Sequence, residues 1–182
     1  MNRQEALELI RQNVQKENLI KHMLAVEAIM KKVAEFLNED EKKWGLVGIL
    51  HDIDFEKIND PKEHGMISAQ ILQGKVDEEI IRAIKSHNFE NTGVMPNSKM
   101  ENCLIAADSI SGLIIAIALI IPSKKLADVK VDSIKKRFKE KDFARNCSRK
   151  RMLFCEKAGI SIDKFYEISL IALQEIASEL GL

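Results

Sequence analysis

Six side chains in this sequence carry the chemistry of a metal site. All four histidines of the chain belong to the set, and two aspartates complete it in the order His22, His51, Asp52, His64, His87 and Asp108. Imidazole nitrogens and carboxylate oxygens are ligands for Mn, Fe, Co, Ni or Zn, and Mg is also possible. The three cysteines lack CxxC spacing, which argues against a zinc site built from thiolates. The sequence therefore predicts one or two divalent metal ions.

Asp108 is the most constrained of the six because it lies in the most apolar stretch of the chain, residues 103–121. A carboxylate there is costly unless it is paired or bound to metal. The same stretch is the one candidate for a membrane span. Its uninterrupted apolar part, LIIAIALII, is shorter than the roughly 20 residues that a bilayer requires. We therefore expect a central buried helix, interrupted by Gly112 and stopped by Pro122, and no membrane partner.

The elements that must position these side chains are helices. Helical periodicity runs through most of the sequence, and strand-like alternation joined by hairpin turns is missing. We expect an all-α, single-domain helical bundle over residues 1–182, because this length suits one domain with its own apolar core. The metal-site core would cover about 19–119, and the basic and C-terminal helices at 123–182 would complete the fold.

Within this bundle, His22 should lie on or beside the buried stripe of a helix over residues 19–37. The next helix is dense in apolar residues and ends near the segment HDID. His51 and Asp52 would point about 100° apart on a helix, so both can reach one ion only where the helix frays or lies against the site.

Two further helices should bring the remaining histidines. One starts at Pro61 and closes at Gly74, and it carries His64 near its beginning. The other begins after Asp77 as its cap and ends at His87.

The composition favours a cytoplasmic protein, and the sequence leaves open whether it is a monomer or a homodimer. An odd number of unpaired cysteines fits a reducing compartment, and the N-terminal segment has no apolar signal-peptide core. Aromatic residues make up only 5%, so a stacking platform for single-stranded nucleic acid is poorly supported.

Residues 124–151 contain twelve Lys or Arg against four acids, a local charge of +8 in a chain with no net charge. Such asymmetry suggests an anionic ligand. The residues that we expect to bind phosphate are Lys124, Lys125, Lys136, Arg137 and Arg145, with Lys135 and Lys139 as further candidates. The alternative is a solvated lysine-rich face. Aromatic residues are not interleaved with these bases, which argues against a nucleic-acid partner.

The ordered pattern H…HD…D resembles the signature of the HD-domain superfamily, which consists of all-helical metal-dependent phosphohydrolases. The apolar helix and HD pair of the family resemble GLVGILHDIDFEK. The helices that carry the two further histidines resemble KEHGMISAQIL and AIKSHN, and the segment with the last aspartate resembles AADSISG. The likeness covers residues 19–119. The whole chain, including IPSKKLADVKVDSIKKRFKEKDFAR, is similar to small stand-alone HD hydrolases.

The resemblance implies that His22, His51, Asp52 and Asp108 bind the first metal ion. The other two histidines match the extra pair of the six-ligand branch of the superfamily, where Asp52 would bridge to a second ion.

Three residues also have other interpretations. His64 could be exposed or contact phosphate without a second ion, and His87 could interact with a helix dipole. Asp54 could orient a metal-bound water or a ligand imidazole, or act only as a turn residue.

The resemblance implies a hydrolase that uses metal-activated water, with Asp52 and Asp54 as catalytic residues. Its substrate would be a phosphoester or phosphoanhydride of a small nucleotide-like or phosphorylated metabolite. The GYP segment of the cyclic-di-nucleotide phosphodiesterases is missing, which argues against that substrate. Two alternatives stay open: a di-iron oxygenase with the same six ligands, such as myo-inositol oxygenase, and a non-catalytic metal-stabilised module that binds a nucleotide.

Overall fold

Helices account for all regular structure over residues 1–182, which the computed structural model describes throughout. The first part of the chain forms α1 (Arg3–Asn13), α2 (Glu17–Leu37), α3 (Glu41–Leu50), α4 (Met66–Leu72), α5 (Glu78–His87), α6 (Phe89–Thr92) and α7 (Lys99–Ile120). The second part forms α8 (Val131–Lys139), α9 (Arg149–Met152), α10 (Phe154–Lys157), α11 (Ile162–Glu175) and α12 (Ala177–Leu180). The short 3₁₀ helices are η1 (Pro61–Glu63) and η2 (Leu126–Asp128). The predicted all-α class is confirmed.

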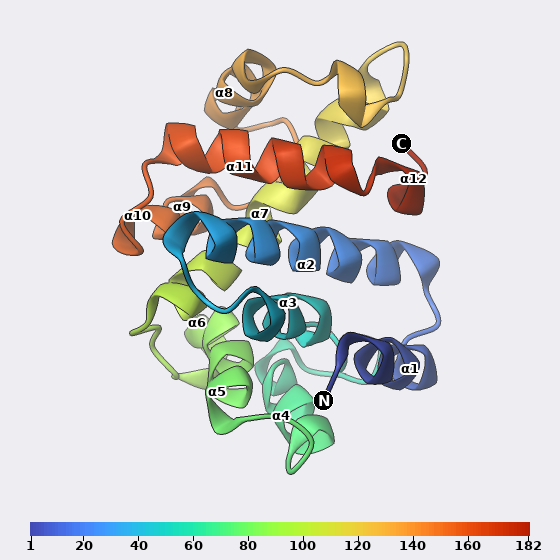
Figure 1. The fold of residues 1–182 in the computed structure, drawn as a ribbon, viewed down its shortest axis with the longest axis vertical. Helices are drawn as coiled ribbons and strands as arrows, with labels where there is room; N and C mark the ends of the chain where they lie inside the picture. Colours follow the sequence, from blue (N-terminus) through green and yellow to red (C-terminus); the bar gives the residue numbers. More distant parts are fainter.

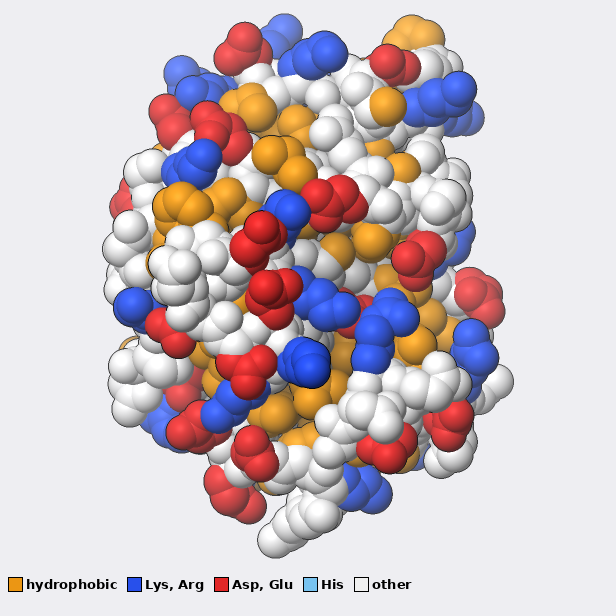
Figure 2. Space-filling model, in the orientation of Figure 1, with side chains coloured by type: hydrophobic (Ala, Val, Ile, Leu, Met, Phe, Trp, Pro, Cys, Tyr) orange, Lys and Arg blue, Asp and Glu red, His pale blue; other side chains and the backbone are white.

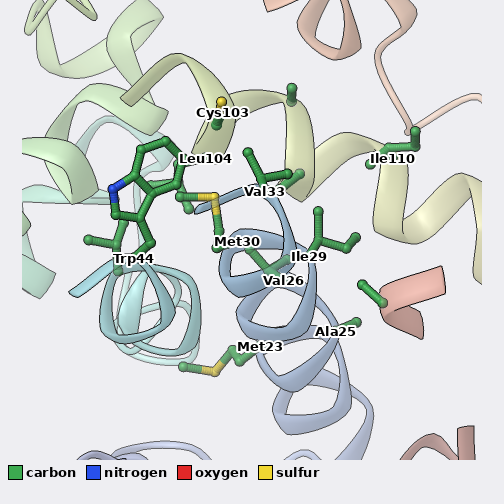
Figure 3. Packing of buried hydrophobic residues seen from close by; sticks show 14 of the residues in the cluster. Met23, Ala25, Val26, Ile29, Met30, Val33, Trp44, Cys103, Leu104 and Ile110 are labelled. Carbon is green, nitrogen blue, oxygen red and sulfur yellow. The ribbon is translucent and has the colours of Figure 1, made fainter. Parts of the chain in front are cut away.

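The long helices α2 and α7 form the centre of the bundle. In Figure 1, α2 crosses the molecule between α11 and α3, and α7 passes behind α2 and α11. Met30 of α2 lies beside Trp44 of α3 and Leu104 of α7 in the close-up of Figure 3, and all three are buried. Each such side chain contributes about 1.5–3 kcal/mol by its burial. One continuous apolar core extends from Ala6 to Leu180, so the whole chain shares it.

The helices α2 and α3 approach each other closely at Gly48, one turn before the HD pair. A Cβ atom added to Gly48 would lie 2.8 Å from the Cα atom of Glu27, so only glycine lets the two backbones meet there. The helix α3 then ends at Leu50, and His51 follows directly as its C-cap. This contact fixes where the HD pair stands relative to α2.

We expect Gly48→Ala to destabilise the fold and to lower metal content, because α3 must move away from α2 and carry His51 with it. The overpacking should lower the free energy of unfolding by about 1–3 kcal/mol, as measured by urea denaturation. Gly45→Ala in the same helix is the matched control, since its Cβ would meet only the flexible side chain of Lys31. Equal stability of the two variants would contradict the proposed role of the contact.

The helix α7 is long and apolar enough to cross a membrane, with a mean hydropathy of 2.4 in its most apolar window. However, 67% of that window is buried by the other helices, as expected for the core helix of a globular protein. This burial fits the predicted central helix. The cytoplasmic location stays a prediction.

Two local predictions were wrong. The helix predicted from Pro61 to Gly74 is divided, because Gly65 adopts a left-handed conformation (φ 85°) between η1 and α4. The helix α7 continues unbroken through Gly112, whose missing side chain makes room for Cys147: a Cβ there would lie 2.8 Å from its sulfur. Gly65 therefore permits a turn of the backbone, and Gly112 permits a close approach of Cys147.

Candidate metal centre

The fold brings all six predicted metal-site residues into one cluster, although they come from five separate segments. His22 lies on the second turn of α2, His51 and Asp52 follow α3, and the remaining three are His64 after η1, His87 at the end of α5 and Asp108 in the middle of α7. The centre of the cluster is Asp52, which is 6% exposed.

The two oxygens of Asp52 face different histidines. Asp52 Oδ2 lies 3.5 Å from Nε2 of His22, which in turn lies 3.3 Å from Oδ1 of Asp108. Asp52 Oδ1 lies 3.3 Å from Nε2 of His64 and 3.5 Å from Nε2 of His87. His51 Nε2 is also 3.3 Å from this second oxygen. A carboxylate in this position can bind one ion with each oxygen.

His51 and His87 are oriented by the same local device. Each follows or ends a helix, and each ring donates its Nδ1–H to the backbone carbonyl three residues earlier: His51 to Gly48 at 2.8 Å, and His87 to Ile84. These carbonyls belong to the last turn of a helix, where no backbone N–H is available to them. The bond leaves Nε2 of both rings with a lone pair directed at the cluster.

His64 and His22 reach the same tautomer through side chains. His64 donates its Nδ1–H to Asp54 Oδ1 at 2.7 Å. The hydroxyl of Ser111 already donates to the carbonyl of Asp108 at 2.8 Å, so it is the acceptor for Nδ1–H of His22 at 3.4 Å. All four imidazoles therefore direct Nε2 toward the two carboxylates, and this is the atom that such histidines offer to a metal ion.

This donor set fits a divalent cation. Nε2 of His51 is buried and has no hydrogen-bond partner, which is unfavourable for a polar atom. Nε2 of His64 and Nε2 of His87 lie only 2.8 Å apart, so their lone pairs face each other unless a proton or a metal ion attracts them. His22–His51–Asp108 and His51–Asp52–His87 each place three donor atoms within 4.8 Å of one another. The cluster is therefore able to hold metal.

The electrostatics of the cluster also suit metal binding. Burial lowers the pKa of His51 to about 4, so its ring is neutral at pH 7. Burial acts to raise the pKa of Asp108, but the bond from His22 and the charges of His22 and His51 together lower it to about 2. In the same way, the surrounding imidazoles hold the pKa of Asp52 well below its usual range despite burial. Burial acts to lower the pKa of His64, but Asp52 and Asp54 together raise it to about 9, so a metal ion that binds this ring must displace a proton.

Asp54 stands behind His64. Its Oδ1 accepts from His64, and its Oδ2 accepts the backbone N–H groups of Gly65 at 2.8 Å and Ser68 at 2.9 Å. Burial acts to raise the pKa of Asp54, but these bonds lower it, and the side chain stays ionised. The contacts agree with the predicted orientation of a ligand imidazole. They do not place Asp54 in contact with Asp52, so we regard it as a positioning residue.

Asp54→Asn should weaken the binding of metal near His64, because an amide orients the ring less firmly than a carboxylate does. We expect a 10- to 100-fold loss of affinity for one ion, the range found when such supporting partners are changed. Isothermal titration with Mn²⁺ would measure it, with Asp128→Asn on η2 as the control. If both ions bound the variant with unchanged affinity, Asp54 would have no orienting role.

Four of the five residues predicted to bind phosphate are exposed, and none of the five has a hydrogen bond or ion pair with the cluster. Arg137, the fifth, pairs with Glu140 and lies 4.7 Å over the ring of Phe143. The exposed four are Lys124, Lys125, Lys136 and Arg145. Figure 2 shows Lys and Arg side chains at the end of the molecule where α8 lies, with acidic side chains among them.

A different arginine reaches the cluster. Arg151 of α9 donates to the backbone carbonyl of His87, and its Nη2 lies 3.5 Å from Oδ2 of Asp108. Its other terminal nitrogen donates to Glu90 at 2.8 Å. Sequence reasoning missed this residue, because it follows Asp108 by 43 residues and is one of many bases in its segment. Only the local excess of positive charge pointed toward it.

The comparisons with known proteins agree with the geometry. No solved structure matches the chain. The family model of the HD domain matches residues 19–113, more than half of the chain and the part that contains all six cluster residues. The chain therefore belongs to the HD domain family.

Proposed function

We propose that this protein is a metal-dependent phosphohydrolase that cleaves a phosphoester or phosphoanhydride of a small nucleotide-like or phosphorylated metabolite. The observation that carries the proposal is the convergence of four imidazole Nε2 atoms on the two oxygens of Asp52. Membership in the HD family supports metal-dependent hydrolase chemistry in general. The choice of a phosphorylated substrate is our inference.

The geometry supports two ions that share Asp52. His22, His51 and Asp108, with Oδ2 of Asp52, would hold the first. His64 and His87, with Oδ1 of Asp52, would hold the second. Mn, Fe, Co, Ni and Zn all accept this mixture of imidazole and carboxylate, and Mg is a weaker fit because only two of the six ligands are carboxylates.

A bound divalent metal ion lowers the pKa of water from about 15.7 toward 7 and polarises a phosphoryl oxygen. The chain's own residues prepare this chemistry. The Nδ1–H bonds fix each ring so that its Nε2 faces inward, and Asp54 holds His64 through the same kind of bond. Because Asp52 and His51 are buried, bulk water is excluded from one side of the site.

One aromatic ring beside the cluster supports a nucleotide-like substrate. The ring of Phe55 lies 5.5 Å from that of His64, at an angle of 90°, and Phe55 is 50% exposed. Phe55 differs from the other exposed large apolar side chains of the protein in that its ring lies against a proposed metal ligand. A planar base could stack on this ring while its phosphate lies at the metal site.

The test is elemental analysis of the purified protein together with a phosphatase screen in which Mn, Co, Ni, Zn, Fe or Mg is supplied. We expect one or two metal ions per chain and release of phosphate from at least one small phosphorylated compound. The di-iron oxygenase alternative predicts stoichiometric iron, a mixed-valent paramagnetic signal and oxygen consumption without phosphate release. A binding module predicts tight nucleotide binding without any product.

A further inference from the structure

Arg151 is the one cation of the chain that contacts the candidate metal centre, and the proposed ligand set does not use it. Its guanidinium donates to the backbone carbonyl of His87 and lies against the carboxylate of Asp108. It therefore contacts one proposed ligand residue of each ion. The side chain is 18% exposed, so part of it is open to solvent.

The surroundings of Arg151 fix its guanidinium in one orientation. The group lies 6.0 Å over the ring of Phe89, which packs against Phe154 at 5.5 Å. Glu90 holds one terminal nitrogen. The three hydrogen bonds use part of a group that has five N–H donors, so others remain for a ligand.

The segment before Arg151 is held firmly as well. The guanidinium of Arg149 donates to the backbone carbonyls of six residues that surround it, namely Arg137, Phe138, Glu140, Phe143, Ala144 and Cys147. This network ties the chain between α8 and α9 around one side chain. The start of α9, and with it Arg151, is therefore placed before any ligand arrives.

The charge of Arg151 is balanced only while Asp108 is free of metal. Once Asp108 binds a divalent ion, the guanidinium lies beside a second positive charge, and its one remaining carboxylate partner, Glu90, is 49% exposed and screened by water. An anion at this position would relieve the repulsion. Arginine also matches the paired oxygens of a phosphoryl group, which two parallel N–H donors can bind together.

We propose that Arg151 binds the phosphoryl group of the substrate next to the metal centre and directs its non-bridging oxygens. The inference rests on the proposed function and refines it: the ligand class is a phosphate monoester or a terminal phosphoanhydride group. The residue that grips phosphate thus comes from α9, and the exposed lysines of α8 take no part.

The experiment is isothermal titration of inorganic phosphate into the Mn²⁺-loaded protein, with metal content measured in parallel. We expect Arg151→Met to weaken phosphate binding by about 10- to 100-fold, the effect of losing a hydrogen-bonded charge, while metal content is unchanged. Arg151→Lys should recover part of the phosphate affinity, because lysine keeps the positive charge but lacks the paired N–H donors of the guanidinium. For a substrate that the protein cleaves in the phosphatase screen, KM should rise in Arg151→Met.

Arg82→Met is the matched control. Arg82 makes the same kind of contacts, to a carboxylate (Glu101) and to a backbone carbonyl (Met95), but it takes no part in the cluster. We expect wild-type phosphate affinity for this variant. Equal phosphate affinity in Arg151→Met and wild type would overturn the inference, as would loss of metal in both Arg151 variants, which would indicate a purely structural role.

The proposed function and this inference can fail separately. If the wild type hydrolyses a phosphorylated compound but Arg151→Met binds phosphate normally, the proposed function is supported and the role of Arg151 is contradicted. If phosphate binding depends on Arg151 but the protein hydrolyses no phosphorylated compound, the anion site is supported and the proposed function is contradicted.

Discussion

Asp52→Ala should abolish metal binding and reduce hydrolysis by at least about 1,000-fold, because without metal the pKa of water returns from about 7 to about 15.7. Asp52 is the only side chain whose two oxygens face both halves of the cluster. Its removal therefore takes a ligand from each proposed ion at once. Elemental analysis after dialysis and a phosphatase assay would measure the two losses on the same sample.

Two further variants make the result interpretable. Asp52→Asn keeps the shape and one oxygen, so it separates the loss of charge from the loss of packing; we expect residual metal but little activity. Asp163→Ala removes an exposed carboxylate that pairs with Lys135 far from the cluster, and it should behave as wild type. Full metal content and activity in Asp52→Ala would contradict the entire site assignment.

The identities of the cluster residues could be predicted from the sequence because they follow a pattern of residue types. Histidine occurs only four times, and one aspartate lies in an apolar helix where it needs a partner. Their orientation could be predicted in part. The bonds of His51 and His87 to carbonyls three residues earlier are local and follow from their place at helix ends.

The remaining features depend on tertiary contacts that leave no local pattern. Ser111 orients His22 from a residue 89 positions away, and only the packing of α2 on α7 brings them together. The division of the 61–74 segment at Gly65 belongs to the same class. Glycine is compatible with a helix interior as well as with a turn, and the bonds from Asp54 to Gly65 and Ser68 decide between them.

Charge composition pointed to the segment that contains Arg151, but the residues predicted from it to bind phosphate make no hydrogen bond or ion pair with the cluster. Twelve bases lie from residue 124 to residue 151, and their charge alone does not distinguish one from another. The predicted phosphate-binding lysines lie in solvent, where long side chains gain most hydration. Arg151 is held inward by a backbone carbonyl and a ring, which no count of charges reveals.

Removal of metal should lower the melting temperature by about 8–16 °C relative to protein saturated at 1,000 times the dissociation constant. That excess of ligand contributes about 4.1 kcal/mol to the folded state, and each kcal/mol shifts Tm by about 2–4 °C for a chain of this size. The physical reason is the cluster itself, since five segments of the fold direct lone pairs and negative charge at one another. Differential scanning calorimetry of chelator-treated and Mn²⁺-saturated protein measures the shift.

Asp52→Ala provides the control for this shift, because a protein that holds no ion should melt at one temperature with or without Mn²⁺. Its melting temperature should also lie close to that of the chelator-treated wild type, since neither protein then holds an ion. A wild-type protein that melted at the same temperature in both conditions would show that the cluster holds no metal. In that case the facing nitrogens of His64 and His87 would have to share a proton instead.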